Sequence, residues 1–170
     1  MEGATHPPSS HRLRTGRVTL RAFVYLLTTV TAKRRALFQN PAAAGIVAQS
    51  LQHFHDRGYV HGFAWVVMPD HIHWLVQLRT GTIDNLMRRM KAWTGYRIRK
   101  SVSEPPPRVW QPGFHDRCVR PHESLRGYIE YLVANPVRWG LVDEPKQYPY
   151  LYAEHEMLDI HGSEPKPFEN

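Results

Sequence analysis

The chain has 170 residues, and its 22 Lys and Arg outnumber its 15 Asp and Glu, giving a formal net charge of +7. With 42% hydrophobic residues, this length predicts one globular domain with its own core, and the basic excess favours a polyanionic partner such as nucleic acid. The single cysteine, Cys118, excludes an internal disulfide and a cysteine-based zinc site.

The first part of the chain predicts an arm, a strand and a helix. Residues 1–17 are polar and basic, so we expect a flexible arm. Residues 18–31 are rich in β-branched and aromatic side chains and predict a long strand. Asn40 followed by Pro41 is typical of a helix start, and this helix should end at Gly58.

The middle of the chain predicts a hairpin and a second helix. Residues 59–68 and 71–78 read as strands joined by a tight turn. Thr82 or Asp84 should cap a helix with one apolar side and one basic side. The basic side could be simply solvated or could contact phosphates. It contains Arg88, Arg89, Lys91, Arg97, Arg99 and Lys100.

The last part predicts a strand within residues 114–120 and a third helix from 121 to about 134, stopped by Asn135-Pro136. Residues 153–170 should form a partly disordered tail. The element order β-α-β-β-α-β-α predicts an α+β domain over residues 18–152. We expect a ferredoxin-like antiparallel sheet with helices on one face.

Two histidines stand out in the predicted hairpin. On a strand, His71 and His73 share one face, while Ile72 points to the other. Neighbouring imidazoles can hold one metal ion on a rigid scaffold. The alternative is that both are polar residues on the solvated face of a half-buried strand.

The third predicted helix carries a candidate nucleophile. Tyr131 and Asn135 are four residues apart and therefore lie on one side of that helix. A phenol close to an amide oxygen and two imidazoles suits metal-assisted attack on a phosphodiester. Alternatively, Tyr131 is a packed aromatic and Asn135 a helix C-cap. Tyr128, three residues before Tyr131, is the second candidate nucleophile.

Three sequence blocks, residues 68–73, 109–117 and 128–142, together resemble the REP-associated tyrosine transposases of the HUH single-tyrosine superfamily. They read Met-Pro-Asp-His-Ile-His, Val-Trp-Gln-Pro-Gly-Phe-His-Asp-Arg and Tyr-Ile-Glu-Tyr-Leu-Val-Ala-Asn-Pro-Val-Arg-Trp-Gly-Leu-Val. The blocks occur in the family's order, and the resemblance extends over residues 18–152.

This resemblance implies a metal site and a covalent mechanism. It makes His71 and His73 ligands of Mg²⁺ or Mn²⁺, and Tyr131 the nucleophile that forms a 5′-phosphotyrosine link with single-stranded DNA. Asn135 falls where related insertion-sequence enzymes carry a metal-binding glutamine. The implied fold is the same ferredoxin-like one, and the implied substrate is a hairpin-forming repeat.

We therefore expect a metal-dependent enzyme that cleaves and rejoins single-stranded DNA. Its partner would be single-stranded or hairpin DNA, and it would act as a monomer or homodimer. Without a signal peptide or a membrane span in the sequence, we expect it in the cytoplasm. The residues expected to contact DNA are Arg88, Arg89, Arg97, His115 and Arg120.

Three alternatives remain open at this stage. The first is a catalytically silent DNA- or RNA-binding protein of the same fold, which would form no covalent adduct. The second is a replication-initiation or relaxase protein, although these usually carry additional domains. The third is an unrelated histidine-metal hydrolase that leaves the tyrosine idle.

Overall fold

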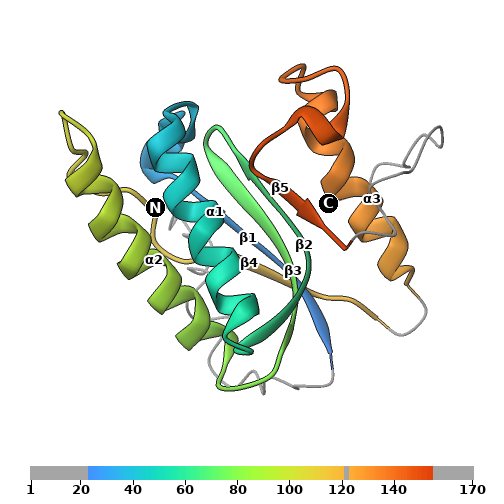
Figure 1. Cartoon of the computed structure of the whole chain (residues 1–170). Helices are drawn as coiled ribbons and strands as arrows, with labels where there is room; N and C mark the ends of the chain where they lie inside the picture. The colour runs from blue at the N-terminus through green and yellow to red at the C-terminus, as the bar shows by residue number, and fades with distance from the viewer. Residues whose placement is uncertain (1–22, 121–122, 155–170) are drawn as a thin grey trace, which may run out of the picture.

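The computed structural model describes residues 23–120 and 123–154. The arm predicted for residues 1–17 and most of the predicted C-terminal tail lie outside these residues. One antiparallel sheet in the order β4-β1-β3-β2-β5 forms the centre of the domain (Figure 1). Its strands are β1 (Val24–Val30), β2 (Val60–Met68), β3 (His71–Leu78), β4 (His115–Cys118) and β5 (Leu151–Ala153).

Strands β2 and β3 form the predicted hairpin, and β3 is the central strand of the sheet. Its side chains alternate between two cores. Ile72 and Trp74 belong to one core, whereas Leu75 belongs to the other. This alternation places His71 and His73 on the same side of the sheet as Leu75.

Helices α1 (Pro41–Asp56) and α2 (Ile83–Ser101) lie side by side over one face of the sheet (Figure 1). The side chain of Asn40 accepts hydrogen bonds from the backbone N–H groups of Ala42 and Ala43, which confirms the predicted N-cap of α1. Of the two caps considered for α2, Thr82 is the one that accepts a backbone hydrogen bond.

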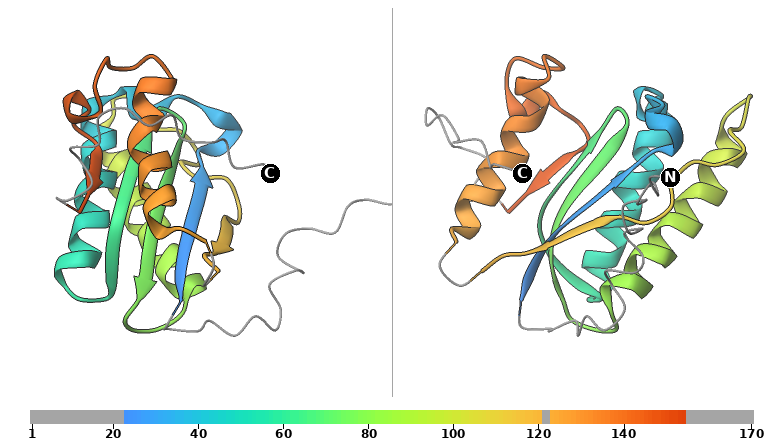
Figure 2. Two further views of the ribbon diagram at one scale, coloured as in Figure 1. Left: turned by 90° about the vertical axis from the view of Figure 1, so that its right-hand side faces the viewer. Right: turned by 180° about the vertical axis from the view of Figure 1, so that it is seen from behind.

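Helix α3 (Leu125–Arg138) packs on the opposite face, as both views in Figure 2 show. The predicted α+β class, ferredoxin-like element order and antiparallel sheet are confirmed, but the expectation that the helices share one face is corrected. The reason is visible in β2, where Trp65 and Val67 enter one core and Ala64 and Val66 enter the other. A sheet that is apolar on both faces needs cover on both.

The third helix is also longer than predicted, because Asn135-Pro136 does not stop it. Pro136 lies inside α3, and the helix ends at Arg138, with Trp139 as C-cap and Gly140 at a φ of 65°. The N–H of Trp139 donates to the carbonyl of Asn135. The interpretation of Asn135 as the C-cap is therefore wrong.

The region after α3 is more regular than predicted. The short helix η4 (Pro145–Gln147) leads into β5, which pairs with the edge of β2. Tyr152 of β5 stacks on Trp65 of β2, with ring centroids 4.0 Å apart. Two further short helices, η2 (Ala32–Arg34) and η3 (Leu37–Gln39), connect β1 to α1. No helix in the described part of the chain is long and apolar enough to span a membrane.

The packing of α3 can be tested with Leu132, which is fully buried against the second face of the sheet. Leu132→Ala leaves a cavity there and should lower the free energy of unfolding by about 2–5 kcal/mol. Leu141→Ala, at a site just after the helix that is 38% exposed, is the control and should cost less than about 1 kcal/mol. Equal and small losses in urea denaturation would contradict the packing of α3 on this face.

Candidate metal and nucleophile site

The histidine pair lies on the α3 side of β3. The ring centroids of His71 and His73 are 4.8 Å apart, and the intervening Ile72 points into the other core. The prediction that the two imidazoles share one face is confirmed by this geometry. The face is not an open, solvated surface, because His71 is 6% exposed.

Both imidazoles are oriented through Nδ1. The carboxylate Oδ1 of Asp70 lies 2.5 Å from Nδ1 of His71, and the hydroxyl of Thr28 lies 2.9 Å from Nδ1 of His73. A carboxylate accepts the Nδ1 proton, and a hydroxyl can accept it too, so both rings can keep Nε2 as an unprotonated donor atom. The other carboxylate oxygen of Asp70 is 3.3 Å from Nη1 of Arg34. Partners of this kind fix the orientation of metal-binding histidines.

The surroundings of His73 favour its neutral ring. Burial, and to a smaller extent the neighbouring His71, lower the pKa of His73 from 6.5 to about 3, while the Asp70 carboxylate opposes the decrease. His73 is therefore uncharged at neutral pH. A histidine must be neutral at one ring nitrogen to bind a metal ion, so no proton has to be displaced from it first.

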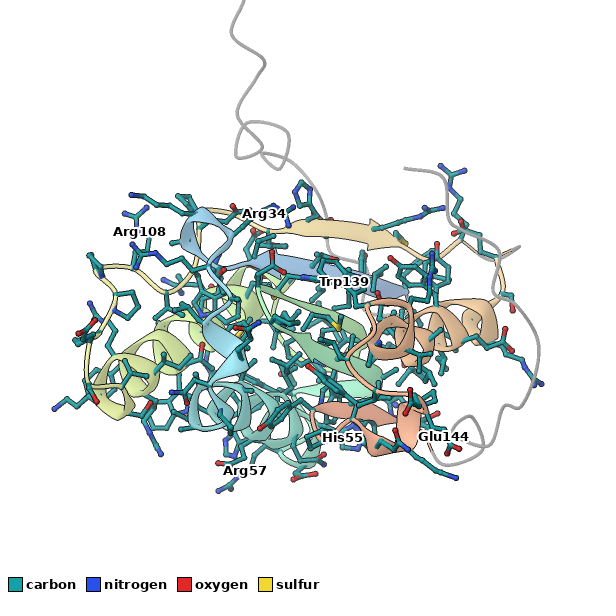
Figure 3. All side chains as sticks on the ribbon, turned by 90° about the horizontal axis from the view of Figure 1, so that it is seen from above. Arg34, His55, Arg57, Arg108, Trp139 and Glu144 are labelled. Carbon is teal, nitrogen blue, oxygen red and sulfur yellow. The ribbon has the colours of Figure 1, made fainter. Side chains whose placement is uncertain are left out.

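Helix α3 passes over the histidine pair with one stripe of residues, Tyr131, Asn135 and Trp139, spaced four apart. The ring of Tyr131 is 5.9 Å from that of His73, and the ring of Trp139 is 5.7 Å from that of His71. Trp139, labelled in Figure 3, is 56% exposed at the end of the helix. The aromatic residues at the two ends of this stripe therefore contact one imidazole each.

Asn135 lies between these two aromatic residues on the stripe and is 4% exposed. Its Nδ2 donates to the carbonyl of Tyr131 at 2.8 Å, which fixes the amide and leaves Oδ1 as its remaining polar atom. The structure therefore brings Tyr131 and Asn135 onto the same side of α3, as their spacing predicted, and the stripe to which they belong faces the two histidines.

Tyr128, the second candidate nucleophile, is placed differently. Its side chain is 1% exposed within the core between α3 and the sheet, and its ring lies 5.7 Å from the guanidinium of Arg117 on β4. Burial raises the pKa of its phenol, which disfavours the phenolate. Of the two tyrosines of α3, Tyr131 is the one whose ring meets the histidine pair.

The Trp-Gln-Pro-Gly block connects α2 to the edge of the sheet. Trp110 is buried and donates from Nε1 to the hydroxyl of Thr94 at 2.9 Å. Nζ of Lys91 donates to the carbonyls of Gln111 and Gly113, at 2.6 Å each. These contacts hold the block against α2, so that the chain enters β4 directly beside β1.

Strand β4 brings His115 to the histidine side of the sheet. His115 pairs with Thr28 of β1, which in turn pairs with His73 of β3. Directly opposed residues of antiparallel strands point to the same face, so His115 is exposed two strands away from His73. Asp116 faces the other side, opposite Leu27.

The five residues expected to contact DNA are not brought together. Arg88, Arg89 and Arg97 project from α2, so the sheet separates them from the histidine pair. His115 lies on the histidine side, and the exposed Arg120 follows β4. The basic composition of the sequence indicated which types of residue could contact DNA, but not the face of the molecule on which each of them lies.

Several residues of the site were not recognised in the sequence. Thr28 and Asp70 orient the imidazoles, and the Arg138 guanidinium lies 5.7 Å from the Tyr131 ring. Asp70 directly precedes His71, and Arg138 closely follows Asn135-Pro136, so their sequence positions weakly indicated a place in the site. Nothing in the sequence indicated Thr28, because only the β1–β3 register places it opposite His73.

Comparisons with known proteins agree with this architecture. A REP-associated tyrosine transposase of Escherichia coli (strain K12) is 29% identical over 87 residues, which is 51% of this chain and 50% of the relative. A relative from Haemophilus influenzae is 28% identical over 98 residues, which is 49% of this chain and 53% of the relative. The chain thus spans about half the length of the curated relatives it matches.

Among solved structures, a REP-associated tyrosine transposase bound to a REP hairpin superposes with a TM-score of 0.65 at 20% identity over 79% of each chain, which supports the fold. Residues 19–132 match the family described as Transposase IS200 like. The resemblance read from the three sequence blocks is confirmed. Because the match covers most of the chain, the chain belongs to the IS200-like transposase family.

Proposed function

We propose that this chain cleaves and rejoins single-stranded DNA through a covalent bond to Tyr131. The observation that carries the proposal is the placement of the Tyr131 ring 5.9 Å from the ring of His73, beneath a helix that also supplies Asn135. Of the tyrosines on α3, Tyr128 is buried in the core, whereas Tyr131 is partly accessible.

We further propose that His71, His73 and Asn135 hold a divalent cation, Mg²⁺ or Mn²⁺. The donor set fits such an ion: each imidazole has its Nδ1 engaged, and the Asn135 amide nitrogen is already bonded, so that two Nε2 atoms and one Oδ1 remain. Nitrogen ligands favour Mn²⁺ over Mg²⁺. When bound, the cation would polarise the phosphodiester and stabilise the departing oxygen.

The residues of the chain supply the nucleophile and its surroundings. In the proposed step, the phenol of Tyr131 gives its proton to water and its oxygen attacks the phosphorus. A Tyr131 O–P bond forms and the bond to the 3′-oxygen breaks; that oxygen takes a proton from water, so the strand leaves with a 3′-hydroxyl. The Arg138 guanidinium lies over the Tyr131 ring, 5.7 Å from its centroid, and would add positive charge beside the phosphate under attack. Attack by a 3′-hydroxyl on the phosphotyrosine reverses the step and rejoins a strand.

The proposed substrate is a hairpin-forming repeat. The solved transposase of similar fold is bound to a REP hairpin, and this chain carries a net charge of +7. A positive protein attracts the phosphate backbone of any nucleic acid. We propose that the single-stranded segment beside the hairpin stem enters the site alongside His73 and Tyr131.

Tyr131→Phe tests the nucleophile, because it keeps the ring but removes the attacking oxygen. With Mn²⁺ and an oligonucleotide containing a repeat hairpin, the wild type should form a denaturation-resistant adduct, and the variant should form none. Folding and DNA binding should be unchanged. Tyr128→Phe is the matched control and should still form the adduct. The proposal fails if Tyr131→Phe forms the adduct, or if Tyr128→Phe alone abolishes it.

The titration of the His73 ring tests whether burial keeps this ring neutral. In the metal-free protein its ring should titrate well below the ordinary pKa of 6.5, towards about 3. Because the folded-state pKa is lower than the unfolded one, the unfolded state takes up the proton first, and stability should fall as the pH drops from about 6.5 towards 3. NMR of the ring gives the midpoint. A midpoint near 6.5 would contradict the burial of this histidine.

A further inference from the structure

A groove between α1 and α2 opens on the face of the domain away from the histidine pair. It has a volume of about 790 Å³. From α2 it is lined by Arg89, Trp93, Tyr96 and Arg97, and from α1 by the polar side chains Gln49 and His53. We call it the α1–α2 groove. Figure 2 shows the two helices on one side of the sheet and α3 on the other.

Two large aromatic side chains stand exposed along this groove. Trp93 is 54% exposed and Tyr96 is 51% exposed. A cation lies near each ring: the Arg97 guanidinium is 5.5 Å from the Trp93 centroid, and Nζ of Lys100 is 5.3 Å from that of Tyr96. Exposed aromatic rings interleaved with cations are the pattern on which unpaired bases stack while their phosphates are neutralised.

The charge along the groove has one sign. Within residues 23–120 and 123–154, none of the residues that line it is acidic. Arg89 is held over the ring of Tyr59 at 4.8 Å, so its guanidinium is positioned near one end. At the other end, Tyr96 also borders a hollow of about 450 Å³ lined by Arg99 and Arg108, and the part of the chain that the structure describes adds no acidic side chain to its lining. The basic surface therefore continues along α2 past Tyr96.

We propose that the α1–α2 groove is a second binding site, for single-stranded DNA, separate from the cleavage site. Bases would stack on Trp93 and Tyr96, and phosphates would pair with Arg97 and neighbouring cations. From Arg89 to Lys100 the helix rises roughly 16 Å, the length of about five stacked nucleotides at about 3.4 Å each.

The same features disfavour other occupants. A second copy of the chain would place two positive grooves against each other, and like charges at an interface are repulsive. Duplex DNA offers phosphates, but its bases are already stacked and cannot use Trp93 and Tyr96. An acidic peptide would pair with the cations, but it would stack on Trp93 and Tyr96 only through any aromatic side chains of its own.

The test is fluorescence anisotropy with a labelled oligothymidylate of about 15 nucleotides, which forms no hairpin, measured without divalent cations. The double variant Trp93→Ala/Tyr96→Ala should bind at least about tenfold more weakly than the wild type. Trp93→Phe/Tyr96→Phe keeps two rings and should retain affinity within about threefold. Circular dichroism checks that both variants fold, as expected for exposed positions.

Trp139→Ala is the matched control, because Trp139 is equally exposed but lies on the other face of the sheet. It should change oligothymidylate affinity less than the groove variant does. If Trp139→Ala weakens binding and the groove variant does not, the strand binds at the histidine face and the proposal is wrong. Equal loss of polyglutamate binding in the groove variant would instead indicate a site for acidic peptides.

A second experiment locates the bound DNA strand directly. Oligothymidylate carrying 5-iododeoxyuridine should crosslink under ultraviolet light to the α2 segment that contains Trp93 and Tyr96. Crosslinking confined to α3 would overturn the proposal. These measurements use neither a metal ion, a hairpin nor the Tyr131 hydroxyl, so their outcome is independent of whether Tyr131 is the nucleophile.

Discussion

The arrangement depends on the central strand β3, which is covered on both of its faces. Its alternation sends Ile72 and Trp74 into the core beneath α1 and α2, and presents His71 and His73 to α3. A slip of one residue in its pairing would exchange these two sets, placing imidazoles in an apolar core. The free energy of burying the apolar residues therefore holds the histidines in position.

Helix α3 adds the second half of the site by the same kind of constraint. Its apolar residues Ile129 and Leu132 are buried against the sheet. With that side fixed, the stripe that contains Tyr131 and Asn135 must lie over the histidine pair. Continuation of the helix through Pro136 extends the stripe to Trp139. The packing of these apolar residues thus sets the distance between Tyr131 and the imidazoles.

Local features were predictable from the sequence. The caps at Asn40 and Thr82 depend on neighbouring residues only, and so does the shared face of His71 and His73 on their strand. The family resemblance came from short blocks, the first of which includes His71 and His73.

Features that depend on distant contacts were not predictable. The partnership of Thr28 with His73 joins residues 45 positions apart through the sheet register. The face chosen by α3 depends on β2 being apolar on both sides, and β5 is too short for its pattern to indicate a strand. Charge alone also gave no indication that Arg97 and His115 lie on opposite sides of the sheet.

The central claim is that β3 and α3 together form one metal and nucleophile site. Paramagnetic broadening by Mn²⁺ in the NMR spectrum of the free protein tests it most directly, since the effect depends on distance from the ion. The ring signals of His71, His73 and Tyr131 should broaden together at low Mn²⁺, while those of Trp93 on the opposite face stay sharp. Broadening of the histidines without Tyr131, or of Trp93 before either histidine, would contradict the account.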